Sequence, residues 1–135
     1  MAVAFNPQYP SSTSDTYTPD KLIAGYNMGI VTQGATLISG QTLTRGAVLG
    51  QITASGKYTL SLSASSDGSQ TPCAVLAEDT DASGGDKACT IYMTGEFNPN
   101  AMTFGTGHTA TTVATVTALR DAGIFLKTYL PNTNS

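Results

Sequence analysis

The acidic segment at residues 78–86, with the sequence EDTDASGGD, holds the side chains best suited to chemistry. Asp79, Asp81 and Ser83 alternate within it, as do the first oxygen ligands of a D-x-D-x-S-G calcium loop. The twelfth position of such a loop requires a bidentate Glu, and here that position is Thr90. The flanks also read as strands and not as the helices of an EF-hand. We therefore expect a polar hairpin loop whose Asp and Ser side chains cap its own backbone, without a metal.

His108 is the only histidine of the chain, so any hydrolytic triad would have to use it. Such a triad needs a nucleophile and an orienting acid beside the histidine. Serines are plentiful, but no G-x-S-x-G elbow accompanies them. One histidine and two cysteines without a two-residue spacing also cannot form a zinc site. We expect His108 to lie on the surface, in a loop of Gly and Thr, and the chain not to be an enzyme.

The two cysteines are predicted to be free thiols that lie in the interior. If the acidic loop is centred near Ser83, Cys73 lies opposite Met93 and Cys89 lies opposite Ala77. That register leaves the two sulfur atoms several residues apart along the strands, whereas a disulfide needs Cα atoms within about 7 Å. Neither thiol lies near a helix N-terminus that would lower its pKa and make it a nucleophile.

Short strands and turns must position these residues, and they begin near Gly29. Alternating apolar residues and turn signals predict strands at residues 30–32, 35–39, 48–53, 58–62, 73–77, 88–94, 102–104 and 124–129. Residues 63–72 contain almost nothing apolar, which predicts a surface loop.

One segment, residues 110–122, departs from the β pattern. Its apolar residues recur at a spacing of three from Val113 to Leu119, which favours a helix of about three turns. Thr109 can serve as the N-cap, and Gly123 stands where a C-cap belongs. The many Thr residues lower helix propensity, so a strand is the alternative.

The composition indicates one mainly β domain. The chain has 135 residues, enough for a core that needs no metal or disulfide. Only 11% of its residues are charged, against about 25% in ordinary soluble domains. Solubility therefore depends on hydroxyl and amide side chains, and the abundant Thr, Ser and Gly favour pleated strands and turns.

The charges and the apolar runs argue against nucleic-acid and membrane partners. The formal net charge is -3, and the Lys and Arg residues are scattered, unlike the basic footprint of a nucleic-acid-binding protein. No apolar run approaches the ~20 residues that span a bilayer. The start, MAVAFNPQYP, lacks the basic and apolar regions of a signal peptide, so we expect synthesis and use in a cytoplasm, or release by lysis.

Residues 1–28 are expected to form an extended N-terminal arm, and residues 29–135 a single β-rich domain. The first twenty residues are rich in Ser, Thr, Pro, Tyr and Asn and show no sustained period. They could be a mere tail. Phe5, Tyr9 and Tyr17 favour an arm that orders against a partner, because aromatic side chains are frequent interface anchors.

Three blocks of sequence, at residues 43–58, 74–98 and 119–127, contain the signals GAVLG, AEDTDASGGD and GEFN. In this order they resemble the head decoration proteins of tailed bacteriophages, the family of the phage lambda capsid-stabilising protein. The positions that carry the resemblance are Gly46, Gly50, Gly56, Glu78, Asp79, Asp81, Gly84, Gly85, Gly95, Phe97, Asn98, Arg120 and Gly123.

The resemblance implies a compact, mainly β fold of the β-tulip type, with one short helix and an extended N-terminal arm that orders on a capsid. It implies homotrimers that bind the major capsid protein on the outside of the expanded shell, at three-fold and quasi-three-fold positions. Such binding stabilises the shell against the pressure of the packaged DNA and needs no cofactor. The competing class is a β-rich domain of a tail fibre, baseplate or adhesin that binds a receptor, although the chain has no Trp to stack on a glycan.

Overall fold

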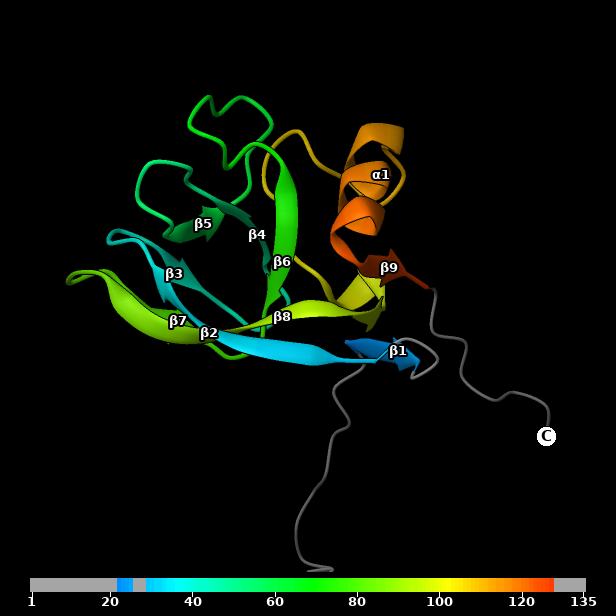
Figure 1. The fold of residues 1–135 in the computed structure, drawn as a ribbon, viewed down its shortest axis with the longest axis horizontal. Helices are drawn as coiled ribbons and strands as arrows, with labels where there is room; N and C mark the ends of the chain where they lie inside the picture. The colour runs from blue at the N-terminus through cyan, green and yellow to red at the C-terminus, as the bar shows by residue number, and fades with distance from the viewer. Residues whose placement is uncertain (1–21, 26–28, 128–135) are drawn as a thin grey trace, which may run out of the picture.

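The computed structural model describes residues 22–25 and 29–127, which form a mainly β fold with one short α-helix (Figure 1). The predicted fold class is thus confirmed. The elements in chain order are β1 (Ile23–Gly25), β2 (Val31–Leu37), β3 (Thr42–Leu43), β4 (Val48–Gln51), β5 (Tyr58–Leu60), β6 (Pro72–Leu76), β7 (Thr80–Asp81), β8 (Lys87–Phe97), the 3-10 helix η1 (Pro99–Ala101), α1 (Val113–Ala122) and β9 (Ile124–Leu126).

Strand β8 is the centre of the main sheet. One of its edges pairs with β1 and β2, both antiparallel, and the other pairs with antiparallel β6 and parallel β9. Because β6 also pairs with β4, the path β8–β2–β5–β4–β6 closes on itself into a small barrel-like sheet. The pair β3–β7 forms a second, two-stranded sheet beside it.

Strands β4, β6 and β8 bury side chains on both of their faces. Leu76 and Ile91 belong to a cluster inside the barrel, whereas their neighbours Val75 and Tyr92 belong to a second cluster. Successive side chains of a strand point to opposite faces, so the two clusters lie on the two sides of the same sheet. The second cluster also contains Leu119 of α1, so the helix packs on the part of the outer face formed by β6 and β8.

The strand boundaries differ from those predicted. Strand β2 is continuous through Gly34, where two short strands were expected, because Gly34 keeps its place opposite Thr90 of β8. Strand β8 runs to Phe97 instead of ending at residue 94. Residues 102–104 form only an isolated bridge, between Thr103 and Ala47, and not the strand that was expected.

The helix begins later than predicted. We expected it over residues 110–122 with Thr109 as the N-cap, but α1 starts at Val113 after Thr112. The Thr109 hydroxyl instead accepts the N–H groups of Thr111, at 3.2 Å, and Thr112, at 3.1 Å. A helix N-cap makes the same two bonds, but here they close a separate turn at residues 109–112, and the helix starts after that turn.

The end of the helix follows the prediction. Gly123 has a φ of 98°, the left-handed conformation that favours glycine, and its N–H bonds to the carbonyl groups of Arg120 and Leu119. Arg120 is exposed in the last turn. Strand β9 follows at once, and its described part is shorter than the predicted strand 124–129, whose last two residues lie outside the described residues.

The segment expected to form the arm meets the folded domain through Leu22 and β1. Leu22 is 1% exposed and belongs to the outer cluster. Strand β1 pairs with the end of β8, with Ile23 opposite Phe97. Residues 1–21 and 26–28 lie outside the described part of the chain.

Candidate functional site

The acidic loop, residues 78–86, binds a distant part of the chain as well as its own backbone. Strand β7 within the loop pairs with β3, with Thr42 opposite Asp81. Asp81 Oδ1 accepts hydrogen bonds from Thr42 Oγ1 at 3.0 Å and from the Ser83 N–H at 2.9 Å. The bond to Ser83 is the predicted local cap, whereas the bond to Thr42 joins the loop to an earlier turn. These hydrogen bonds, those from Ser83 first, lower the pKa of Asp81.

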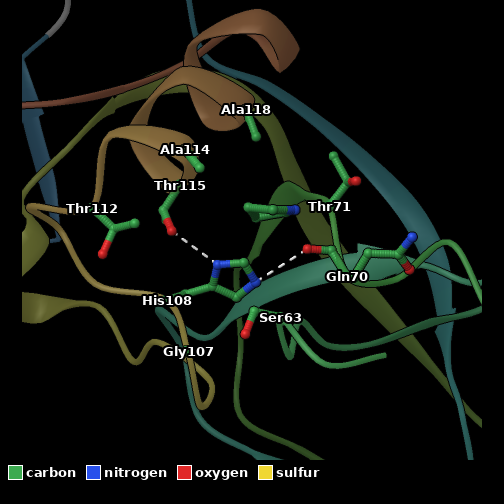
Figure 2. A pocket seen from close by; sticks show the side chains of 10 residues that line it. Ser63, Gln70, Thr71, Gly107, His108, Thr112, Ala114, Thr115 and Ala118 are labelled. Carbon is green, nitrogen blue, oxygen red and sulfur yellow. Dashed lines mark hydrogen bonds between the residues drawn. The ribbon is translucent and has the colours of Figure 1, made fainter. Parts of the chain in front are cut away.

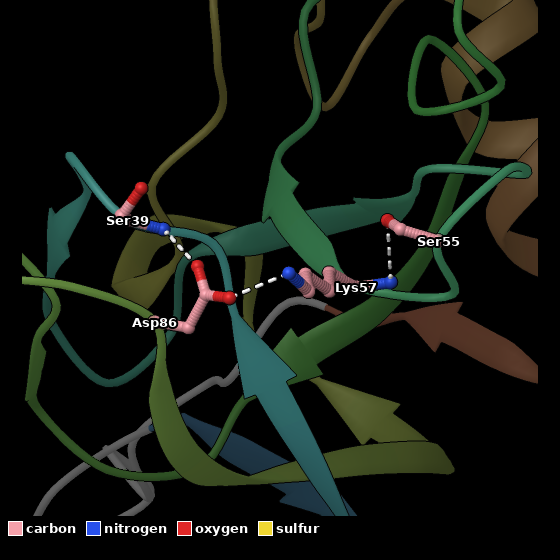
Figure 3. Close-up of polar contacts among 4 residues, drawn as sticks. All are labelled: Ser39, Ser55, Lys57 and Asp86. Carbon is pink, nitrogen blue, oxygen red and sulfur yellow. Dashed lines mark hydrogen bonds and ion pairs between the residues drawn. The ribbon is translucent and has the colours of Figure 1, made fainter.

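Two further carboxylates of the loop also bind earlier segments. Asp79 Oδ1 accepts the Arg45 N–H at 2.8 Å. Asp86 accepts the Ser39 N–H at 2.8 Å and pairs with Lys57 Nζ at 2.5 Å (Figure 3). The bonds from Lys57 and then from Ser39 lower the pKa of Asp86. These hydrogen bonds and the ion pair hold the β6–β8 connection against residues 39–57.

No metal centre accompanies these carboxylates in the part of the chain that the structure describes. Within it, no group of three or more His, Cys, Asp or Glu side chains lies close enough to hold an ion. Glu78 is exposed, and its carbonyl accepts a hydrogen bond from the Thr80 hydroxyl. Gly84 and Gly85 continue the loop where nothing lies within 4 Å of a Cβ position, so neither faces a crowded site.

Arg45 links the acidic loop to the interior through its side chain. The sequence alone did not identify this residue. Its Nη1 donates to the Ala77 carbonyl at 3.0 Å and to the Tyr92 hydroxyl at 2.7 Å. The guanidinium carbon lies 5.5 Å from the centroid of the Tyr92 ring, within the range of a cation–π contact. Arg45 directly precedes the GAVLG signal, and it is one of only six Lys and Arg residues. Its position and the rarity of basic residues could have identified it from the sequence.

The two glycines of the GAVLG signal lie where the backbone leaves no room for a side chain. Gly46 has a φ of 100°, and a Cβ there would stand 2.5 Å from the Ala101 carbonyl oxygen. A Cβ at Gly50 would overlap the backbone carbonyl of Ser69. Gly56 has a φ of 76° in the loop between β4 and β5, a left-handed conformation that favours glycine.

The GEFN signal joins the end of β8 to the outer cluster. Phe97 is fully buried, and its ring centroid lies 5.3 Å from that of Tyr92. Gly95 has a φ of 149°, and a Cβ there would crowd the Phe97 ring at 2.9 Å. Glu96 is 7% exposed and pairs with Lys127 Nζ at 3.2 Å. The signal thus combines a glycine that leaves room for a ring with a fully buried aromatic side chain.

Asn98 completes this signal as a capping residue. Its side-chain oxygen accepts the Asn100 N–H at 3.1 Å and starts η1. Its own N–H donates to the Leu22 carbonyl at 2.6 Å, which ties β1 to the end of β8. Most residues of the family pattern thus stabilise turns, strand ends or places where two backbone segments come close together. The exceptions are the exposed Glu78, Gly84 and Arg120.

The model of the bacteriophage lambda head decoration protein D family matches residues 11–124 of this chain. The match covers most of the chain: it includes the first two blocks that carry the resemblance in full and the third block as far as residue 124, the first residue of β9. The chain belongs to this family. No match was found among the curated proteins. Membership makes the protein a structural component of the phage capsid, with a decoration role, and its family is not one of enzymes.

The histidine of this decoration protein lies in the interior, so the prediction of a surface position was wrong. His108 is 9% exposed. Its Nδ1 lies 2.9 Å from Thr115 Oγ1 of α1, and its Nε2 lies 3.1 Å from the Gln70 carbonyl (Figure 2). Nε2 also lies 3.1 Å from Ser61 Oγ. Ser61 Oγ donates to the Ser69 carbonyl at 2.7 Å. Because both neighbours of Nε2 are therefore acceptors, the hydrogen bonds assign the tautomer of the neutral ring in which Nε2 donates and Nδ1 accepts from Thr115.

This histidine forms one wall of a pocket of about 250 Å³ between α1 and the loop before β6. Other lining residues are Ser63, Gln70, Thr71, Thr112, Ala114 and Ala118 (Figure 2). Among the described residues no buried side-chain nitrogen or oxygen lacks a hydrogen-bond partner. The hydroxyls of Ser61 and Thr115 beside His108 are engaged in structural bonds, and no acid of residues 22–25 or 29–127 bonds to the ring as in a triad.

The cysteines are free, as predicted, but only one is fully buried. Cys89 is buried and Cys73 is half-buried. Burial raises the pKa of both thiols, which disfavours the reactive thiolate. The strand register differs from the predicted one by one residue, because Val75 lies opposite Tyr92.

Phe5, Tyr9 and Tyr17, the predicted anchors to a capsid, lie outside the described residues.

In the part of the chain that is described, no helix has the length and apolar character needed to cross a membrane.

Proposed function

We propose that this protein is a cement of the phage head that binds the major capsid protein on the outer surface of the expanded shell. Its partner subunits are copies of itself, in homotrimers that sit at three-fold and quasi-three-fold positions. It is made in the host cytoplasm and joins the head after the shell has expanded. The observation that carries the proposal is the family match over residues 11–124.

The folded domain has the character that such a cement needs. The acidic loop holds the β6–β8 connection in place through Asp79, Asp81 and Asp86, and β4, β6 and β8 carry packed side chains on both faces. A rigid domain loses little conformational entropy when it binds, so more of its interaction energy appears as affinity.

The proposed mechanism is mass action. A protein that binds only the expanded lattice stabilises that lattice by about 2.7 kcal/mol per site when its free concentration is ~100 times the dissociation constant. Trimers that bridge neighbouring capsomers add avidity, because each subunit raises the effective concentration of the other two. The sum over many sites opposes the internal pressure of the DNA, and no reaction on a substrate is required.

The arm, proposed for residues 1–28, supplies part of the capsid contact through Phe5, Tyr9 and Tyr17. Large aromatic side chains are the commonest energetic anchors of interfaces, and a segment that orders on binding can cover a large surface. The arm enters the domain at Leu22, whose carbonyl bonds to Asn98, so a bound arm would be coupled directly to the GEFN signal.

The test measures DNA retention. DNA-filled heads that lack the protein are heated in a divalent-cation chelator with increasing amounts of the full chain or of a variant without residues 1–21. Retention should rise to a plateau with the full chain and only weakly with the shortened one. The triple variant Phe5→Ala, Tyr9→Ala, Tyr17→Ala should behave like the shortened chain. Heads that release DNA equally with and without a bound full chain would contradict the cement role.

A further inference from the structure

The first part of β2 has an outer edge that no described strand occupies. Strand β2 pairs with β8 along its whole length, but with β5 at one position only, Leu37 opposite Tyr58. In Figure 1, β1 and β2 lie along the lower margin of the fold, with β8 on their inner side. Within residues 22–25 and 29–127, no other strand pairs with β2 before Leu37.

The register identifies the backbone groups that point outward along this edge. On β8, the Thr90 carbonyl accepts the Ala77 N–H, so Thr90 faces β6 and its neighbours face β2. Residues of an antiparallel strand alternate between facing the partner and facing away. Since Thr90 lies opposite Gly34, Gly34 also faces away from the pair. Thr32, two residues earlier, faces the same way.

The other end of β2 gives the same assignment independently. Ile38 donates its N–H outward to the Tyr58 carbonyl at 2.9 Å, on the side of β5. Counting back in steps of two from Ile38 gives Thr36, Gly34 and Thr32 as the outward residues. The N–H and carbonyl groups of Thr32 and Gly34 therefore form a short, accessible ladder that ends where β5 begins.

The side chains around this ladder leave it open to a partner. Residues 31–34 are all exposed, on both faces of the strand, and Val31 is 53% exposed although it is a large apolar residue. Nothing lies within 4 Å of a Cβ position at Gly34. Natural edge strands are usually protected by charged side chains or proline, but residues 31–35 read VTQGA and contain neither.

We propose that the outer edge of β2, over residues 31–35, is a docking site for an extended, uncharged segment of the capsid subunit, which adds a strand to the sheet. The proposal rests on the proposed capsid-binding function and names a contact on the folded domain, separate from the arm. Strand addition satisfies the outward N–H and carbonyl groups of Thr32 and Gly34, and small neighbouring side chains admit the incoming backbone. The neutral edge favours a segment without charges, because a buried charge there would have no partner.

Amide hydrogen exchange tests the site residue by residue. In the free protein the amides of Thr32 and Gly34 should exchange fast, while those of Gln33 and Ala35, which face β8, exchange slowly. On saturated expanded heads, the Thr32 and Gly34 amides should become protected by at least about tenfold. Exchange is quenched, the protein is released from the heads, and the peptide covering residues 29–38 is fragmented in a mass spectrometer.

Two variants at Gly34 provide a matched pair. Gly34→Pro removes one outward N–H and fills the edge without removing a bond to β8, whereas Gly34→Ala keeps the N–H and adds a methyl group in open space. Gly34→Pro should weaken binding to heads by at least about tenfold relative to Gly34→Ala. Thermal unfolding of both variants shows whether each is folded, and if Gly34→Pro is not, the exchange experiment on the unaltered protein decides.

Three results would overturn the proposal. If heads bind the protein while Thr32 and Gly34 stay unprotected and Gly34→Pro binds like Gly34→Ala, capsid binding stands and the edge site falls. Protection of both amides that grows with protein concentration in the absence of heads would make a second copy the occupant. If the unaltered protein does not bind expanded heads at all, the proposed function fails together with this site.

Discussion

Replacing His108 by Leu tests whether the buried histidine network holds α1 against the barrel. The substitution roughly keeps the volume but removes both ring nitrogens. Ser61 keeps its bond to the Ser69 carbonyl, so it is not left without a partner. The Gln70 carbonyl and the hydroxyl of Thr115, which is 1% exposed, both lose theirs.

The expected cost follows from these two groups. A buried polar group that loses its partner costs about 1–3 kcal/mol. Thr115 lies in a helix and can turn its hydroxyl toward a carbonyl of the preceding turn, which recovers part of the loss. Gln70 is half-buried, so water can reach its carbonyl. We therefore expect His108→Leu to lower the free energy of unfolding by about 2 kcal/mol in total, and to lower Tm by about 6–10 °C.

Urea titrations followed by circular dichroism measure this change, and an unaltered m-value shows that the unfolded state is the same. Thr115→Val and the double variant complete a cycle, in which the two substitutions should be less than additive by about 0.5–1.5 kcal/mol. Thr106→Leu, at an exposed position of the same loop, is the control and should be nearly neutral. A loss below about 0.5 kcal/mol for His108→Leu, or full additivity in the cycle, would refute the reasoning.

Three further predictions concern the rest of the described fold. Gly50→Ala should lower the free energy of unfolding by about 2 kcal/mol or more, because its Cβ overlaps a backbone carbonyl, while Gly84→Ala, in open space, should change it by less than about 0.5 kcal/mol in the same urea titration. The pKa of Asp86 is lowered in the folded state, so the stability it contributes is complete above the ordinary carboxyl pKa of about 3.9 and declines as the pH falls through the folded value. Asp86→Asn should therefore flatten the fall in unfolding free energy below about pH 5, and an unchanged slope would contradict this. Cys73 and Cys89 should react slowly with a thiol reagent at pH 8 in the native protein and completely in urea, because burial raises the pKa of both; complete reaction of the native protein within the mixing time would contradict the structure.

Local patterns in the sequence predicted the parts of the fold that depend on neighbours in the chain. Gly123 was recognised as a helix C-cap because a left-handed glycine after an apolar period is a local signal. The start of the helix was missed because Thr109 can cap either a helix or a short turn, and the two look alike in sequence. Gly34 was taken as a strand breaker, although pairing with β8 on one side suffices to keep it in the strand.

Contacts between distant segments could not be predicted in this way. The acidic loop caps its own backbone through Asp81, as expected. Its carboxylates also bind Ser39, Thr42 and Arg45, which only the closure of the barrel brings near. His108 was placed on the surface because its neighbours are Gly and Thr. Its actual environment comes from Ser61 and the loop before β6, far away in the chain.

Binding to expanded heads is the measurement that tests the central claim most directly. Purified protein is titrated onto undecorated heads of its own phage, in the expanded form and in the unexpanded form, and the bound protein is counted after sedimentation. The cement role predicts that binding to expanded heads saturates at about one copy of the protein for each capsid subunit, and that unexpanded heads bind none. An absence of binding to competent expanded heads, or equal binding to both forms, would contradict it.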